Sequence, residues 1–195
     1  FGSSHFWAPH RGARAAAGRP AWSRRSSAGR AMPVFQSRFE VPASLEAVRA
    51  FHQDDVARVF GALAPPGTPV TFQRPMGVMS EGAVLEFTMY LGGFLPIRWT
   101  AVHSDVCATG FVDTMTQGPV LSWAHAHRFV PAGGEAESTI VEDVIEYEYG
   151  GGVKGCVARV LFNTMGLRVL FLWRAFATRR MLAKEKGPRA PLLAK

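Results

Sequence analysis

Residues 122–147, SWAHAHRFVPAGGEAESTIVEDVIEY, consist of two alternating stretches joined by a turn that contains Gly133 and Gly134. Every second side chain of a β-strand points to the same face of its sheet. The two stretches therefore predict a hairpin that gathers aromatic, imidazole and carboxylate groups on one face: Trp123, His125 and His127 from the first strand, and Val141, Asp143, Ile145 and Tyr147 from the second. Such a face is typical of a pocket wall rather than of a plain hydrophobic core.

The acidic residues of the second strand indicate which of its faces points inward. One face carries Glu142, Glu146 and Glu148, whereas the other carries Asp143 as its only acid. Burying three unpaired carboxylates costs far more free energy than burying one. We therefore expect Asp143 to point toward the interior of the protein.

Further pocket residues are expected from the neighbouring strands and from the C-terminal helix. These residues are Trp99, Phe111, Asp113, Met115 and Met165. The opposite face of the first hairpin strand, with Ser122, Ala124 and Ala126, is an alternative lining, because small side chains also suit a crowded interior.

The hydrophobic pattern predicts one α+β domain over residues 32–183. The first strand, from Phe35 to Val41, stops at Pro42, and Ser44 is a plausible cap for a short helix that contains Leu45, Val48 and Phe51. A second short helix is expected over 55–63. Six further strands are expected at 70–74, 84–91, 95–104, 110–116, 120–130 and 138–149, followed by helical residues 153–183.

This order of elements resembles the START-like, or SRPBCC, superfamily over about residues 33–183. The resemblance is carried by the aromatic-x-His-x-His-x-Phe strand at 123–129, the Thr-x-x-x-Asp-x-x-x-Tyr strand at 139–147 and LFLWRAFATRRML at 170–182. It points to the polyketide-cyclase-like and coenzyme-Q-binding branches. The resemblance implies a helix-grip fold, in which a curved seven-stranded antiparallel sheet wraps around a long C-terminal helix. Such folds enclose a cavity for lipids, quinones, polyketides or other apolar molecules.

Three interpretations compete for His125, His127 and Asp143. They could bind a metal ion, because imidazoles two residues apart share a strand face, but no independent third ligand motif supports this. They could act as general acid and base in a cyclase or dehydratase. We favour a hydrogen-bonded group that tunes an otherwise apolar pocket, and we assign no metal ligand and no catalytic residue.

The charge of the chain is divided unevenly along its length. Residues 1–31 carry a net charge of +6, residues 32–150 a net charge of −8 and residues 151–195 a net charge of +9. The acidic body argues against nucleic-acid binding by the domain, although the basic arm (1–31) and tail (184–195) could touch RNA or anionic lipid. The arm is rich in Arg, Ser, Ala and Gly and lacks acids, as organellar transit regions do.

The C-terminal helical segment has more apolar surface than packing on one sheet requires. We expect Phe162 and Trp173 to meet a partner protein or a membrane surface, with Arg179 and Arg180 approaching anionic groups. No transmembrane span is expected, because four polar residues interrupt the most apolar stretch, 157–176. Cys107 and Cys156 suggest neither a disulfide framework nor a zinc site.

The sequence therefore favours a protein that binds an apolar small molecule, such as a lipid, a quinone or a polyketide-like molecule. No cofactor is assigned other than such a bound lipid or quinone. We also expect peripheral membrane contact. The arm and the C-terminal helix are expected to join the protein to a large assembly, such as a respiratory complex. A mitochondrion is favoured over a plastid, or a bacterial cytoplasm if the arm is not a targeting remnant. One alternative is a polyketide cyclase or aromatase. Another is a structural subunit whose pocket is vestigial.

Overall fold

The computed structural model describes residues 32–74, 76–133 and 137–185. The basic arm and most of the C-terminal tail lie outside the described residues. The elements are β1 (Val34–Val41), α1 (Leu45–Gln53), α2 (Val56–Leu63), β2 (Val70–Arg74), β3 (Val84–Leu91), β4 (Leu95–Cys107), β5 (Gly110–Gln117), β6 (Ser122–Pro131), β7 (Thr139–Glu148), α3 (Gly152–Leu161) and α4 (Thr164–Glu185). The strands form one antiparallel sheet in the order β1-β7-β6-β5-β4-β3-β2.

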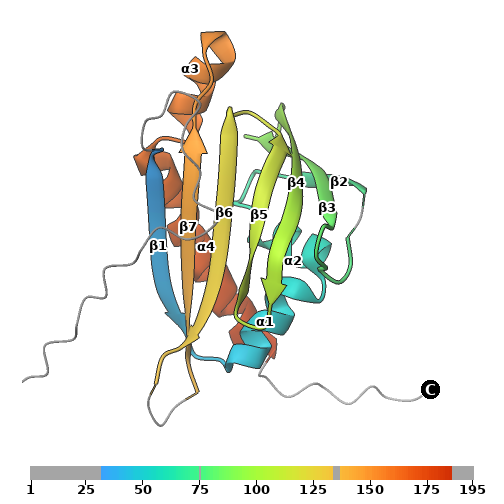
Figure 1. The fold of residues 1–195 in the computed structure, drawn as a ribbon, viewed down its shortest axis with the longest axis vertical. Coiled ribbons are helices and arrows are strands. Elements are labelled where there is room, and N and C mark those ends of the chain that lie inside the picture. The colour runs from blue at the N-terminus through green and yellow to red at the C-terminus, as the bar shows by residue number, and fades with distance from the viewer. Residues whose placement is uncertain (1–31, 75, 134–136, 186–195) are drawn as a thin grey trace, which may run out of the picture.

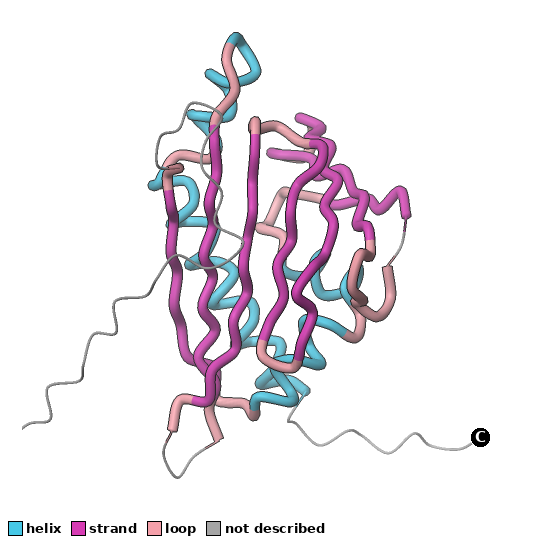
Figure 2. Tube along the Cα trace, in the orientation of Figure 1, coloured by secondary structure: helices cyan, strands magenta, loops and turns pink. Residues whose placement is uncertain are grey.

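The main helices cover one face of this sheet. Helix α4 crosses behind the strands, α1 and α2 lie toward its C-terminal end, and α3 projects beyond the end of the sheet (Figure 1, Figure 2). Four apolar side chains of α4 are buried at helical spacing: Leu167, Phe171, Ala175 and Leu182. They pack against the sheet and the short helices, so the hydrophobic core lies between the strands and α4.

The predicted inward register of β7 is confirmed. Val141, Asp143 and Ile145 have no exposed surface, whereas Glu142 on the other face pairs with Arg38 at 3.2 Å. Glu146 also lies on that other face but is only 4% exposed, so not every acid of the outward register is solvated.

Local sequence signals set the ends of the short helices. The hydroxyl of Ser44 accepts a hydrogen bond from the backbone N–H of Ala47 at the start of α1, as expected. Asp55 caps α2 in the same way through the N–H of Arg58. The predicted strand ends are close to those observed, although β4 continues to Cys107 rather than stopping at Ser104.

The C-terminal helical segment is not one continuous helix. Its two helices meet at Phe162 and Asn163 with a bend of 50°. The Asn163 side chain donates to the carbonyl of Val160 at 2.9 Å and accepts from the N–H of Gly166 at 2.8 Å. One side chain therefore closes α3 and caps α4, because a short amide competes well for exposed backbone groups.

No single helix among the described residues is long and apolar enough to cross a membrane. Helices α3 and α4 reach the length and apolar composition of a membrane-spanning segment only when they are counted together across their bend.

Candidate functional site

A cavity of about 180 Å³ lies between the sheet and the helices. Most of its lining is aliphatic or aromatic, including Leu85, Phe87 and Trp99 from the sheet, Val59 from α2 and Phe171 from α4. The polar and ionisable groups on the wall are fewer: His52, His103, Asp113, His125, His127 and Arg174. The cavity is thus an apolar space with one polar region.

The polar region is built by cross-strand pairing in the middle of the sheet. Asp113 on β5 lies opposite His125 on β6, and His127 on β6 lies opposite Asp143 on β7. Because these residues alternate along their strands, all four side chains point to the helix-covered face. The rings of the two histidines lean together, with centroids 3.8 Å apart.

Each histidine contacts both aspartates. His125 Nε2 lies 3.0 Å from Asp143 Oδ1, and His125 Nδ1 lies 3.5 Å from Asp113 Oδ2. His127 Nε2 lies 2.9 Å from Asp113 Oδ2, and His127 Nδ1 lies 3.1 Å from Asp143 Oδ1. Asp113 Oδ2 therefore lies beside one nitrogen of each ring, His125 Nδ1 and His127 Nε2, which we call the near nitrogens. Asp143 Oδ1 lies beside the other nitrogen of each ring, His125 Nε2 and His127 Nδ1, which we call the far nitrogens. We call these four residues the His–Asp cluster.

Arg174 connects α4 to the cluster. A terminal guanidinium nitrogen of Arg174 lies 3.1 Å from His127 Nδ1, and its Nε lies 3.5 Å from Asp143 Oδ2. An arginine only donates, so while this hydrogen bond is made His127 carries its proton on Nε2 and donates it to Asp113. The guanidinium supplies a compensating positive charge for the fully buried Asp143.

Charge balance determines the ionisation of the cluster. Burial raises the pKa of Asp143, but Arg174 and the hydrogen bonds of His125 and His127 outweigh burial and hold that pKa well below its ordinary value. The pKa of Asp113 is lowered in the same way, with burial opposed by the two histidines. Burial lowers the pKa of His125, with His127 acting in the same direction. Both aspartates are therefore ionised at neutral pH, and His125 is neutral.

Two further histidines reach the cavity from other elements. His52 on α1 donates from Nδ1 to the carbonyl of Val48 at 2.9 Å, packs on Phe129 and leaves Nε2 without a hydrogen-bond partner among the described residues. Burial, followed by the charge of Arg174, lowers the pKa of His52 to about 3. His103 on β4 lies opposite Asp113 and is also buried.

No protein-family model matches the sequence, and no curated protein sequence matches it significantly. Solved structures do match the fold. The Zhui aromatase/cyclase from Streptomyces sp. R1128 aligns with a TM-score of 0.63 at 15% identity, over 80% of this chain and 97% of that chain. Norcoclaurine synthase from Thalictrum flavum aligns with a TM-score of 0.58 at 18% identity, over 80% and 97%. A START superfamily protein from Mycobacterium smegmatis aligns with a TM-score of 0.55 at 14% identity, over 78% and 99%.

This chain has the START-like, helix-grip fold. The alignments span almost the whole length of those proteins, and the strand order and long C-terminal helix agree with the architecture expected from the sequence. At 14–18% identity they establish the fold of this chain and leave its ligand to be argued from the site.

Most of the pocket residues expected from the sequence reach the START-like cavity. These are Trp99, Phe111, Asp113, Trp123, His125 and His127. The alternative lining by Ser122, Ala124 and Ala126 is not observed. Asp143 contacts His125 Nε2 and His127 Nδ1 and does not line the cavity.

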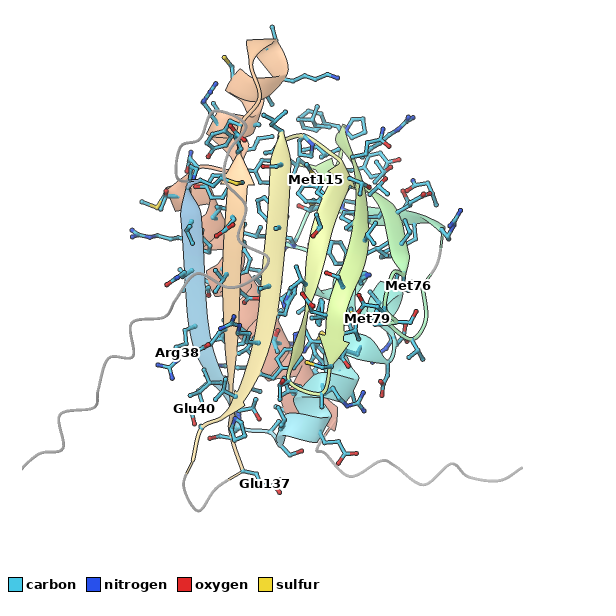
Figure 3. All side chains as sticks on the ribbon, in the orientation of Figure 1. Arg38, Glu40, Met76, Met79, Met115 and Glu137 are labelled. Carbon is cyan, nitrogen blue, oxygen red and sulfur yellow. The ribbon has the colours of Figure 1, made fainter. Side chains whose placement is uncertain are left out.

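Three of the expected pocket residues lie elsewhere. Tyr147 packs on Trp123 in the core, 6.1 Å between ring centroids, and is not part of the lining. Met115 is buried in the core toward the end of the sheet from which α3 projects (Figure 3). The prediction for Met165 is wrong, because this side chain is 66% exposed just after the break between α3 and α4.

The expected partner contacts also change. Phe162 is 7% exposed and lines the cavity beside Trp99 and Trp123, so it is not a surface contact. Its carbonyl accepts a hydrogen bond of 2.7 Å from the Tyr149 hydroxyl, which holds the helix break against the sheet. Trp173 is half-buried and donates to the carbonyl of Ala64.

The two arginines of the expected partner contact differ from each other. Arg179 donates from Nε to the carbonyl of Glu40 at 2.8 Å and covers the Phe39 ring, so it is engaged within the domain. Arg180 is exposed and lines a shallow groove with Arg58 and Lys184.

Sequence reasoning missed Arg174 and His52 as site residues. Arg174 is one of the polar residues that interrupt the apolar stretch 157–176, and it lies three residues after Phe171 and one before Ala175, which are both buried. His52 follows Val48 by four residues and so shares its face of α1. Helical spacing could have identified both.

An exposed apolar face runs along the last two helices. It consists of Val153, Val157 and Val160 on α3 and Met165, Val169, Leu172 and Phe176 on α4, each between 45% and 82% exposed. We call it the α3–α4 apolar face. Residues 152–184 contain no acid, and five of their basic side chains are exposed outside the contacts of Arg174 and Arg179: Lys154, Arg159, Arg168, Arg180 and Lys184. The charges near this face are therefore basic.

Proposed function

We propose that this protein binds an apolar small molecule in the cavity beneath its sheet. The observation that carries the proposal is the cavity itself: about 180 Å³ of space lined mainly by aliphatic and aromatic side chains. An apolar protein cavity of about 150 Å³ holds one benzene molecule. A ring-sized group therefore matches this volume, and the tail of a lipid or a long-chain quinone would have to extend beyond it.

The polar wall favours a ligand with one oxygen-bearing end. Asp113, the two cluster histidines and Arg174 lie on the cavity wall together with apolar side chains from α2 and β3. A ring carbonyl or hydroxyl could hydrogen-bond there while the rest of the molecule remains in apolar contact. Quinones, phenols and aromatic polyketides share this chemistry.

The test combines ligand identification with a change that fills the cavity. Protein purified without detergent is extracted and analysed by mass spectrometry for stoichiometric lipids and quinones. The variant Ala101→Phe fills the cavity, because Ala101 is buried on the cavity wall. Val144→Phe, on the other face of the sheet, is the matched control. The proposal predicts loss of the bound ligand in the first variant and retention in the second. Equal ligand content in both variants, or no stoichiometric ligand in the native protein, would overturn it.

An enzymatic role is a distinct outcome of the same work. Two fold neighbours are named as an aromatase/cyclase and a norcoclaurine synthase, both of them enzymes. The purified protein is therefore incubated with an aromatic poly-β-keto substrate, and the products are separated by chromatography. Retention without conversion supports the binding protein, whereas catalytic turnover assigns the cavity to a cyclase.

We also infer that the α3–α4 apolar face rests on an anionic membrane surface, from which an apolar ligand would enter. The support is its exposed apolar side chains together with basic residues such as Lys154, Arg168 and Arg180, a combination that suits an anionic interface. Phe162 follows α3 directly and lines the cavity, so the helix break within the α3–α4 apolar face lies next to the cavity.

Vesicle flotation tests this contact. Wild-type protein should float with vesicles that contain phosphatidylglycerol and float less with pure phosphatidylcholine. Replacing Val160 and Leu172 by Ser should reduce flotation several-fold. Phe94→Ser, at an exposed apolar residue on the β3–β4 turn, serves as the control and should leave flotation unchanged. Absence of wild-type flotation with either lipid would exclude the membrane surface.

A further inference from the structure

We propose that Asp113, His125 and His127 form a binding site for a divalent transition-metal ion, such as Zn²⁺, at the wall of the cavity. The sequence offers two histidines on one strand but no evident third ligand. The structure supplies it: Asp113 from the neighbouring strand brings a carboxylate oxygen to the same side as the two rings. This inference goes beyond ligand binding and does not depend on it.

The three donor atoms have spacings that a single ion can bridge. Asp113 Oδ2 lies 2.9 Å from His127 Nε2 and 3.5 Å from His125 Nδ1, and the three residues each offer one donor atom within 4.8 Å of the other two. With metal–ligand distances of about 2.0 to 2.2 Å, two donors on one ion are about 2.9 Å apart in octahedral geometry and about 3.4 Å apart in tetrahedral geometry. Both distances to Asp113 therefore need little adjustment.

The far sides of the rings have the partner that metal-binding histidines require. Asp143 Oδ1 lies 3.0 Å from His125 Nε2 and 3.1 Å from His127 Nδ1. A carboxylate that accepts both far protons fixes the tautomer in which the near nitrogens present lone pairs to the ion. His127 would then carry its proton on Nδ1 instead of Nε2. It would donate this proton to Asp143 and would no longer accept a hydrogen bond from Arg174.

Charge also favours a cation at this place. The described cluster brings two carboxylate side chains together with one guanidinium at a largely buried position. A divalent ion at Asp113 would pair with the carboxylate that Arg174 does not contact. Two histidines with one carboxylate are a ligand set used by zinc and by non-haem iron, and the remaining coordination positions would face the apolar cavity.

Titration of chelator-treated protein with CoCl₂ and ZnCl₂, followed by visible absorption for Co²⁺ and by calorimetry for Zn²⁺, tests the site. We expect one ion per chain with a dissociation constant of about 1 µM or lower. Asp113→Asn, His125→Ala and His127→Ala should each weaken binding at least tenfold. Asp143→Asn, which removes only the outer carboxylate, should weaken it by about 10- to 100-fold.

His52→Gln is the matched control, because His52 lines the same cavity outside the ligand set. It should leave the affinity within twofold of wild type. Circular dichroism confirms that each variant is folded, and a variant that does not fold is replaced by the Gln substitution at the same position. Wild-type protein that binds neither ion, or ligand-set variants that bind as tightly as His52→Gln, would overturn the metal site. Either result leaves the mass-spectrometric test of ligand binding unaffected.

Discussion

His52 should make the stability of this protein depend on pH in a way that one substitution removes. Its side chain is 5% exposed, its Nε2 atom lacks a partner among the described residues, and its pKa falls to about 3 from 6.5. The unfolded chain therefore binds a proton at this position below pH 6.5, whereas the folded chain does so only near pH 3. The contribution of His52 to the free energy of unfolding is therefore present in full above pH 6.5 and decreases as the pH falls toward 3.

The size of the effect follows from these two pKa values. Between pH 7.5 and pH 5, protonation of His52 in the unfolded chain alone lowers the free energy of unfolding by about 2 kcal/mol. Urea unfolding followed by tryptophan fluorescence measures this difference at the two pH values. His52→Gln should lose about 2 kcal/mol less than wild type over that range.

Other titrating groups, including the His–Asp cluster, contribute to both proteins and cancel in the comparison. Phe51→Leu is the control, because it disturbs the neighbouring core position without removing a titratable group. It should lower stability equally at both pH values. If His52→Gln loses as much stability as wild type between pH 7.5 and pH 5, the argument from burial is refuted.

Three further substitutions test the framework of the site. Gly110→Ala should destabilise the protein by about 2 to 4 kcal/mol in urea unfolding, because the new Cβ would overlap the backbone carbonyl of His127 on the paired strand. Asp143→Asn should cost about 3 kcal/mol in the same assay, because it leaves Arg174 half-buried without its compensating charge. Asn163→Ala should cost about 1 kcal/mol and reduce amide protection at the start of α4 in hydrogen exchange, because it removes the cap.

Two of these predictions have matched comparisons. Gly118→Ala also introduces a close contact, but with the flexible side chain of Met115, so its cost should be clearly smaller than that of Gly110→Ala. Glu142→Gln removes a carboxylate of β7 from an exposed ion pair and should change stability by less than about 1 kcal/mol. Equal costs within either pair would contradict the reasoning from backbone overlap or from burial.

The sequence by itself determined the sheet and its inward face. Strand alternation identified Trp123, His125 and His127 as one group, and the cost of burying several carboxylates selected the register of Asp143. These are local properties, because the period of a strand and the chemistry of its side chains do not depend on distant residues. Most of the aromatic cavity wall could be predicted on that basis, whereas the START-like fold was expected from the resemblance of the motifs and of the order of elements to that superfamily.

Only the tertiary structure decided which groups meet around the histidines. Asp113 and Asp143 lie on different strands, and their separation into a cavity-facing and a hidden carboxylate depends on how β5, β6 and β7 pair. Arg174, which lies 47 residues after His127 in the sequence, joins them from α4. The bend at Asn163, likewise, turned Phe162 into the cavity and left Met165 at the surface. Side-chain periodicity identifies the face on which a residue lies, but contacts between elements depend on how the whole chain packs.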